Sequence, residues 1–211
     1  MSFRDLTIRD FMKVLSDGTP TPGGGSVAAL SGAMSAALIA MVARLTRGNK
    51  KFEGAWPDME ETLGKVEPLG RRLLELSDED SSAYNEVIAA FRLPKEDDAQ
   101  KKRRREAVQK AFQNAALVPL EGLKNLLALS RAAGIAVEKG NPSSITDAGV
   151  GLQLIRAAAV GVAYNIRINL TSLEDTAFVS RVLGEMNALL KELTEVLREA
   201  EKTVDKRLRI S

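Results

Sequence analysis

One carboxylate of this 211-residue chain stands where an apolar side chain would continue a helical stripe. In the segment LLELSDEDSSAYNEV, Asp80 follows Leu76 by four residues and precedes Tyr84 by four, so all three share one helix face. Burial raises the pKa of a carboxyl group, and a raised pKa suits a general acid or base. Two interpretations stay open: Asp80 transfers protons, or it pairs with an arginine or caps a neighbouring helix. Asp78 and Glu79 fall off the stripe and are expected to be solvated.

A glycine-rich segment precedes the most apolar part of the chain. It reads PGGGS and consists of Pro22, Gly23, Gly24, Gly25 and Ser26. Successive glycines expose backbone N–H groups, and a helix start adds partial positive charge, which together suit a phosphate or carboxylate ligand. No Gly-Lys-Ser/Thr follows, so the segment is not a Walker A loop. The alternative is a tight turn that lets helices pack closely.

Three further polar segments are candidates for binding. Asp147, in GNPSSITDAGVG, lies in a first helical turn, where capping and a favourable dipole interaction are favoured over catalysis. Asn165 and Asn169, in YNIRINL, share one helix face and either bond to buried backbone or contact a polar ligand ring. The run KKRRR at residues 101–105 is typical of a solvated helix face, and it could also attract a polyanionic ligand tail.

The composition restricts the chemistry further. The chain has no Cys and no His, which excludes a thiolate nucleophile, a disulfide, a Cys/His zinc site and an imidazole base. Proton transfer must therefore use Asp, Glu, Lys, Tyr or water, and no metal site is predicted. A net charge of +2 gives no argument for nucleic-acid binding. The lack of Cys is compatible with the cytoplasm.

The first elements that must position these residues are helices. Thr7 and Asp10 resemble a capping box, and the short helix that follows should end at Gly18. Ser26 should cap a helix that runs to about Thr46, apolar on every side and therefore buried on every side. This stretch is long enough to raise the question of a membrane span, but its TPTPGGG opening and small residues argue against one.

Helical spacing continues through the rest of the chain. A helix should start at Asp58 and be kinked or divided at Pro68. Pro119 interrupts the next helix, Ser144 belongs to a further capping box, and a last amphipathic helix begins near Asp175.

No segment shows sustained period-two alternation, and Ala and Leu are strong helix formers. The predicted fold is all-α. It is a single domain over residues 1–211, a bundle of long helices with a buried small-residue helix after the glycine-rich loop.

Taken together, these segments resemble the cyclodeaminase/cyclohydrolase family of folate enzymes, which includes the C-terminal domain of formiminotransferase-cyclodeaminase. The matching segments span about residues 7–180, and the opening TPTPGGGS and the NIRINL motif are the most specific. The resemblance implies an all-helical fold, a homodimer, and folate bound in a cleft beside the glycine-rich loop. It also implies that the second Asp of the D-x-D motif, here Asp80, is catalytic.

The implied chemistry occurs at the one-carbon bridge between N5 and N10 of tetrahydrofolate. We expect a 5,10-methenyltetrahydrofolate cyclohydrolase first, and a 5-formiminotetrahydrofolate cyclodeaminase that releases ammonia as the alternative. An alternative of another class is a non-catalytic helical interaction protein. The tetrahydrofolate derivative is substrate, with no cofactor; it is expected to be polyglutamylated in some forms, and neither a nucleic acid nor a membrane is expected as a partner. The substrate-binding residues expected on this basis are Pro22, Gly23, Gly24, Gly25, Ser26, Asp147, Asn165 and Asn169.

Overall fold

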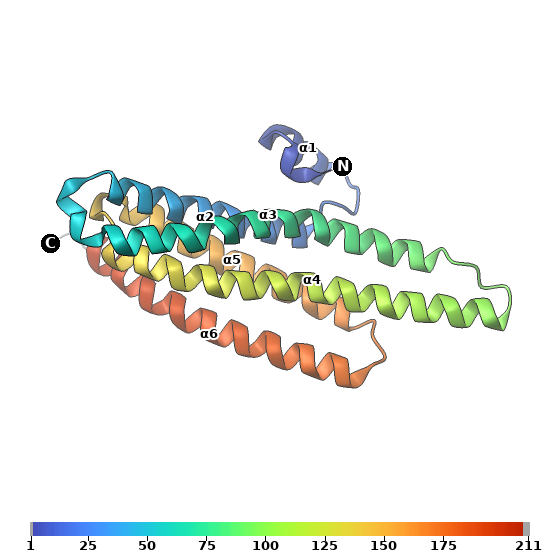
Figure 1. The fold of residues 1–211 in the computed structure, drawn as a ribbon. Coiled ribbons are helices and arrows are strands. Elements are labelled where there is room, and N and C mark those ends of the chain that lie inside the picture. Colours follow the sequence, from blue (N-terminus) through green and yellow to red (C-terminus); the bar gives the residue numbers. More distant parts are fainter. Residues whose placement is uncertain (1, 209–211) are drawn as a thin grey trace.

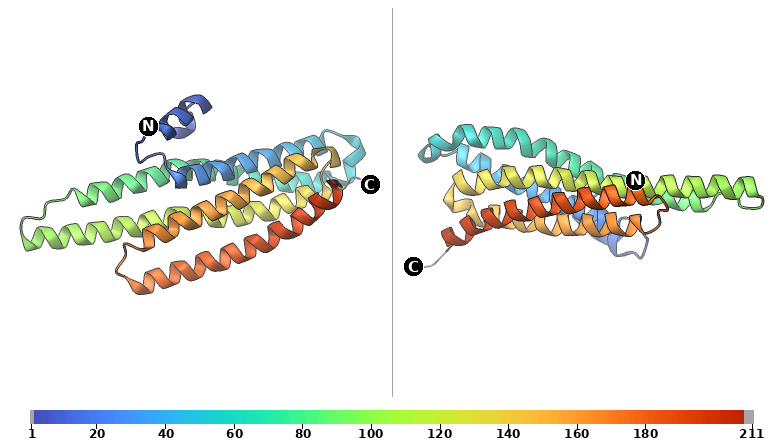
Figure 2. Two further views of the ribbon diagram at one scale, coloured as in Figure 1. Left: turned by 180° about the vertical axis from the view of Figure 1, so that it is seen from behind. Right: turned by 90° about the horizontal axis from the view of Figure 1, so that it is seen from below.

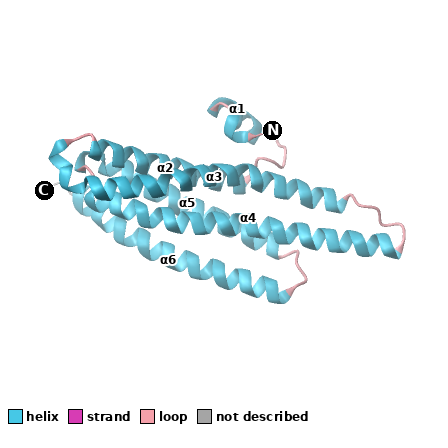
Figure 3. Ribbon diagram, viewed as in Figure 1, coloured by secondary structure: helices cyan, strands magenta, loops and turns pink. Residues whose placement is uncertain are grey.

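The computed structural model describes residues 2–208, and within this range the chain forms helices joined by short connections, with no strand (Figure 3). The all-α prediction is confirmed. The α-helices are α1 (Ile8–Ser16), α2 (Gly24–Arg47), α3 (Trp56–Phe91), α4 (Asp98–Lys139), α5 (Ile145–Leu170) and α6 (Thr176–Leu208). The 3₁₀ helices are η1 (Phe3–Asp5), η2 (Lys50–Ala55) and η3 (Pro142–Ser144).

The five long helices form two layers (Figures 1 and 2). One layer contains α3, α4 and α6, with α4 in the middle, and the other contains α2 and α5 side by side. The core between the layers is almost entirely aliphatic, and Ile39, Leu73, Leu123 and Leu152 are fully buried there. Figure 1 shows that the end of α3 and the start of α4 extend beyond the other helices.

Several predicted helix ends are confirmed by their hydrogen bonds. The backbone N–H of Asp10 donates to Oγ1 of Thr7 over 3.1 Å at the start of α1. The N–H of Phe178 donates to Asp175 over 2.9 Å at the start of α6. Pro68, however, does not divide α3, which is continuous from Trp56 to Phe91. A single missing N–H is tolerated because tertiary packing, more than local propensity, stabilises a long helix.

Two predicted caps are wrong. Gly23, rather than Ser26, is the N-cap of α2, and no side chain caps that helix. Ser144 makes no capping hydrogen bond at the start of α5; instead the N–H of Ser143 donates to Oδ1 of Asn141 over 3.0 Å. Both serines are buried, so their hydroxyl groups lie among neighbouring helices rather than at a solvated helix start.

The prediction that the helix after the glycine-rich loop is buried on every side is also wrong. Met34 of α2 is 49% exposed and Leu45 is exposed to the same degree. The reason is architectural, because a helix in a two-helix outer layer has neighbours on some sides only. The outward face of α5 is similar, with Val150, Tyr164 and Ile168 exposed. Gly24–Arg47 and Pro142–Leu170 are long and apolar enough to cross a membrane, but here both segments pack into the bundle.

Candidate active site

A cleft of about 440 Å³ lies where four helices and one loop meet. Its walls come from the loop before α2, the start of α2, the C-terminal half of α3, the middle of α4 and the end of α5. The residues that line it are Pro20, Thr21, Gly23, Gly24, Gly25, Asp80, Tyr84, Val87, Ile88, Phe91, Phe112, Ala115, Asn165, Ile168, Asn169, Thr171 and Ser172. Residues separated by as many as 152 positions in the sequence, from Pro20 to Ser172, thus surround one space of a size that suits a small organic ligand.

Asp80 lies in this cleft, beside the N-terminus of α2. The hydroxyl of Ser26 donates to Oδ2 of Asp80 over 3.0 Å. A Cβ atom at Gly25 would lie 2.1 Å from Oδ1 of Asp80, so the carboxyl group rests directly on the glycine backbone. Burial raises the pKa of Asp80, and the side chain and backbone of Ser26 partly oppose that rise. Asp80 is therefore a desolvated carboxyl group whose charged form is stabilised mainly by one serine.

The two acidic neighbours of Asp80 form hydrogen bonds outside the cleft. The Glu79 side chain is 43% exposed, as predicted, whereas the Asp78 side chain is 21% exposed and only partly solvated. Asp78 accepts hydrogen bonds from the Ser2 hydroxyl over 2.6 Å and from the Phe3 N–H over 2.7 Å, and so attaches the N-terminal segment to α3. Glu79 accepts two hydrogen bonds from Arg72. Only Asp80 of the three points into the cleft.

Some residues of the glycine-rich segment line the cleft, and others are buried behind it. Gly23, Gly24 and Gly25 line the cleft, as a ligand-binding role requires. Pro22 follows a cis peptide bond and is buried next to these glycines. Ser26 is fully buried behind Asp80 and does not line the cleft. The structure therefore makes Ser26 a partner of Asp80 rather than a group placed to contact substrate.

Both predicted asparagines lie in the cleft, and each donates one of its two amide N–H groups to a backbone carbonyl oxygen. Nδ2 of Asn165 donates to the carbonyl oxygen of Gly161 over 2.9 Å, and Nδ2 of Asn169 donates to that of Ala115 over 2.7 Å. These bonds fix the orientation of each amide and leave its Oδ1 to accept a hydrogen bond from a ligand. Both open interpretations of the pair are thus partly met, since each side chain binds backbone and also faces the cleft.

An aromatic wall was missed by the sequence reasoning. Tyr84 and Phe91 of α3, two helical turns apart, line the cleft together with Phe112 of α4. The rings of Phe91 and Phe112 contact each other edge to face, with centroids 6.0 Å apart. The signal was present in a chain with few aromatic residues, because Tyr84 and Phe91 continue the Asp80 stripe. The pairing with α4 could not be seen in the sequence.

Comparison with known proteins agrees with this arrangement. The model of the formiminotransferase-cyclodeaminase family matches residues 7–188, most of the chain. The chain belongs to this family.

Relatives of the family occur in two forms. A methenyltetrahydrofolate cyclohydrolase from Methylorubrum extorquens is 39% identical over 88% of this chain and 89% of its own length. The formimidoyltransferase-cyclodeaminase of Sus scrofa is 31% identical over 88% of this chain, but the match spans only 34% of that longer protein. The crystal structure of a formiminotetrahydrofolate cyclodeaminase from Thermotoga maritima superposes with a TM-score of 0.87 at 26% identity, covering 97% of this chain and 98% of the other.

Within this chain, Asp147 lies far from the other residues that were predicted to bind substrate. It lies in the first turn of α5, whereas Asn165 lies near the end of the same helix. Their separation is about 27 Å at 1.5 Å per residue. A role for Asp147 in substrate binding stays a prediction, and within one chain the helix geometry keeps it away from the cleft.

The basic run lies near the rim of the cleft. Arg104 places its guanidinium 5.4 Å from the ring centroid of Phe91 and donates to the Phe91 carbonyl oxygen. Arg105 forms an ion pair with Glu174. Lys101 pairs with Asp98 on the same helix, with both side chains well exposed. The run is therefore a solvated helix face at one end and a neighbour of the aromatic wall at the other.

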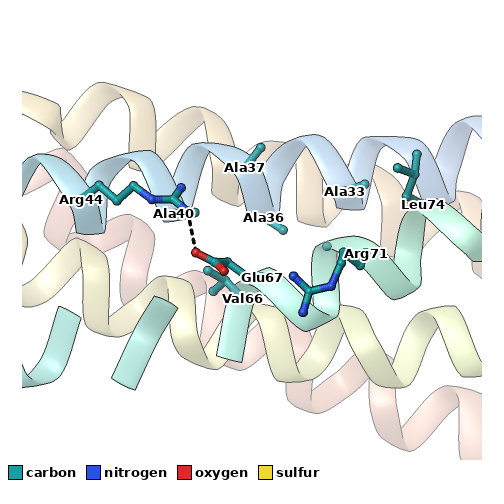
Figure 4. A pocket seen from close by; sticks show the side chains of 10 residues that line it. Ala33, Ala36, Ala37, Ala40, Arg44, Val66, Glu67, Arg71 and Leu74 are labelled. Carbon is teal, nitrogen blue, oxygen red and sulfur yellow. Dashed lines mark hydrogen bonds and ion pairs between the residues drawn. The ribbon is translucent and has the colours of Figure 1, made fainter. Parts of the chain in front are cut away.

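A second groove lies between α2 and α3 (Figure 4). Alanines of α2, including Ala36, face Gly70 of α3, where an added Cβ would come within 2.9 Å of the Ala36 Cβ. Arg44 and Glu67 form an ion pair across its rim. The groove holds none of the predicted site residues, and close helix packing accounts for its small side chains.

Proposed function

We infer that this protein is a folate enzyme acting at the one-carbon bridge of tetrahydrofolate, and that its main reaction is hydrolysis of the 5,10-methenyl derivative. The observation that carries the proposal is the charge of the cleft. Among the described residues that line it, Asp80 is the one Asp, Glu, Lys or Arg. A methenyl bridge is cationic, so a single desolvated carboxylate stabilises it electrostatically without a competing cation. The cyclohydrolase relative from Methylorubrum extorquens supports the same reaction.

The cleft offers matching groups for the rest of the ligand. Phe91 and Phe112 provide apolar surface for a flat ring. Oδ1 of Asn165 and of Asn169 can accept hydrogen bonds from ring N–H groups. The backbone of the glycine-rich segment lets a ligand approach Asp80 closely.

The proposed reaction needs one proton carrier. Asp80 accepts a proton from a water molecule as the water oxygen bonds to the methenyl carbon, which gives a neutral tetrahedral carbinolamine. Asp80 then returns that proton to N5 as the bond between carbon and N5 breaks. The carbinol oxygen releases its own proton to solvent and becomes the carbonyl of 10-formyltetrahydrofolate. General acid–base assistance of this kind contributes on the order of a hundredfold to ten-thousandfold.

Cyclodeamination is the second candidate, and the structural similarity to the Thermotoga maritima cyclodeaminase favours it. In that reaction N10 attacks the 5-formimino carbon and ammonia leaves, so the same carbon becomes tetrahedral. Asp80 would protonate the leaving nitrogen. The cleft therefore serves either reaction with the same residue in the same role.

The direct test follows the absorbance of 5,10-methenyltetrahydrofolate with and without the protein. Cyclohydrolase activity predicts loss of the methenyl absorbance well above the uncatalysed rate. In a parallel assay with 5-formiminotetrahydrofolate, cyclodeaminase activity predicts that the same absorbance appears and ammonia is released. A non-catalytic interaction protein would change neither rate, and that result would overturn the proposal.

The protein is also proposed to act as a homodimer through the outward face of α2 and α5. Exposed apolar residues follow one another along both helices of this layer, among them Met34, Met41, Val160 and Tyr164. Adjacent apolar side chains over two helices are typical of a protein interface. Sedimentation equilibrium should give twice the chain mass, and Met34→Lys with Tyr164→Lys should shift the protein to monomer. A monomeric wild type at micromolar concentration would contradict the dimer.

The charged tail of a polyglutamylated substrate is proposed to contact the basic run. Neutralising Lys101, Lys102 and Arg103 should weaken binding of the polyglutamylated substrate more than that of the monoglutamate. The difference should shrink as salt rises, because exposed charges are screened. Equal effects on both substrates would mean that the basic run is a solvated helix face with no role in binding the tail. We propose a cytoplasmic location, without nucleic acid or membrane as partner.

A further inference from the structure

Behind Asp80, on the side away from the cleft, lies a buried pair of hydroxyl groups. Ser26 of α2 and Ser81 of α3 place their Oγ atoms 3.0 Å apart. Ser26 is fully buried and Ser81 is 5% exposed, and neither lines the cleft. Because Ser26 also donates to Oδ2 of Asp80, the three side chains form one chain of hydrogen bonds from Ser81 through Ser26 to the carboxyl group.

The direction of this chain follows from counting protons. Each serine has one hydroxyl proton to donate. If Ser26 gives its proton to Asp80, then the bond between the serines must use the proton of Ser81. Within the described residues, Ser26 is the one partner in hydrogen-bond range of the Ser81 hydroxyl. Reversing the chain would leave the Ser81 proton buried without an acceptor, which is costly.

We propose that Ser81 is a positioning residue: through Ser26 it holds Oδ2 of Asp80 as a hydrogen-bond acceptor, so that Oδ1 is the oxygen that exchanges the proton. Oδ1 accepts no side-chain hydrogen bond among the described residues. The inference rests on the proposed function in one respect only, namely that the exchanged proton goes to and from substrate. The orientation of the hydroxyl chain is a property of the protein alone.

Apart from the two serines, few groups near Asp80 could change its pKa. From α2, α4, α5 and the loop before α2, the side chains that line the cleft are not titratable. On α3, Tyr84 is titratable and lies one turn away, while Asp78 and Glu79 are bound to the N-terminal segment and to Arg72. Burial raises the pKa of Asp80, and the side chain and the backbone of Ser26 both oppose that rise; the side-chain contribution is the one that the serine chain predicts.

The test compares Ser26→Ala, Ser81→Ala and Ser77→Ala. Ser77 is a matched control, because it is a buried serine of α3 whose hydroxyl donates to the carbonyl oxygen of Leu74 in its own helix. The pKa of Asp80 is read by carboxyl ¹³C NMR, with the resonance assigned by its absence in Asp80→Asn. The pH profile of turnover is recorded in parallel.

We expect a graded upward shift of the Asp80 pKa. Ser26→Ala removes a direct bond to the charged group and should raise the pKa by about one to two units. Ser81→Ala removes the donor behind it and should raise the pKa by about half a unit to one unit. Ser77→Ala should leave it unchanged, and Ser81→Thr, which restores a hydroxyl, should return it towards the wild-type value.

The two readouts separate the inference from the proposed function. An unshifted NMR pKa in a folded Ser81→Ala, or an equal shift in Ser77→Ala, overturns the hydroxyl chain. If the NMR pKa shifts in the expected order and the acid limb of the rate profile moves with it, the inference holds in full. If the NMR pKa shifts while the rate profile stays fixed, the hydroxyl chain stands and the assignment of Asp80 as proton carrier is overturned.

Discussion

The helices α2 and α5 lie side by side, and each begins after a short polar segment rich in glycine, proline and serine. At the start of α2 the carboxylate comes from a different helix, because Asp80 of α3 rests on Gly25 and bonds to Ser26. At the start of α5 the carboxylate is that helix's own Asp147, which lines no part of the cleft. The two helix starts thus differ in whether another element brings a titratable group to them, and only the start of α2 has the arrangement that the proposed reaction needs.

The largest expected effect comes from separating the two partners at the start of α2. In Gly25→Ala the new Cβ would overlap the Asp80 carboxyl group, which must then leave its position. We expect turnover to fall by at least about a hundredfold, because the proton carrier is displaced. The control is Gly64→Ala in α3, where an added Cβ meets no neighbour within 4 Å. Similar turnover in both variants would mean that the contact between Gly25 and Asp80 has no role in the reaction.

In the proposed homodimer, the start of α5 would acquire a comparable role through the cleft of the partner subunit. Asp147 and Arg167 each lie ten residues from Ala157, so a two-fold axis crossing α5 near Ala157 would bring the partner's Asp147 to the cleft end of this helix. On this arrangement Asp147→Asn should lower turnover by about tenfold, through loss of a positioning contact.

Mixed dimers test that arrangement. A mixture of equal amounts of Asp80→Asn and Asp147→Asn, unfolded and refolded together, should recover about a quarter of wild-type turnover, because half of the dimers contain one intact site. If Asp147 acts only within its own chain, each mixed dimer instead contains one Asp147→Asn site and one Asp80→Asn site. The mixture would then show the simple average of the two variants.

The stability of the protein should depend on pH through Asp80 at the start of α2. Burial raises the pKa of Asp80 above that of the unfolded chain. Between about pH 4 and the folded-state pKa, the folded state therefore binds more protons than the unfolded state. The free energy of unfolding of wild type should therefore fall, relative to that of Asp80→Asn, as the pH rises through the folded-state pKa. Melting curves from pH 4 to pH 7 measure this difference, and an unchanged difference would show that Asp80 is not desolvated.

The smallest effect on turnover is expected at Asp78. Asp78→Asn weakens the hydrogen bonds to Ser2 and Phe3, so amide exchange in the N-terminal segment should accelerate while turnover stays within about threefold of wild type. Hydrogen exchange followed by mass spectrometry gives the first quantity and the methenyl assay the second. If Asp78→Asn lost as much turnover as Gly25→Ala, Asp78 would matter to the reaction as much as the position of Asp80 does, and the distinction between the two residues would be wrong.

The fold could be predicted because its signals are local. Helical spacing gives the long helices, and the capping pattern at Thr7 gives the start of α1. Asp80 could be singled out for the same reason, since Leu76 and Val87 on either side of it are buried as the stripe requires.

The rest depends on contacts between distant segments. Ser26 looks like a cap in sequence, but its partner is 54 residues away on another helix. Asp78 looks solvated until the N-terminal segment folds onto it. The incomplete burial of α2 follows from the number of its neighbours, which periodicity does not reveal.

The central claim is that Asp80 carries the proton, and one substitution tests it most directly. Asp80→Asn keeps the size of the side chain and much of its hydrogen bonding but removes the titrating group. Turnover of 5,10-methenyltetrahydrofolate should fall by at least about a hundredfold, while affinity for the product 10-formyltetrahydrofolate, which lacks the cationic bridge, and the melting temperature stay near or above those of wild type. A folded variant that keeps more than about a tenth of wild-type turnover would contradict the account, because loss of a general acid–base should cost more than that.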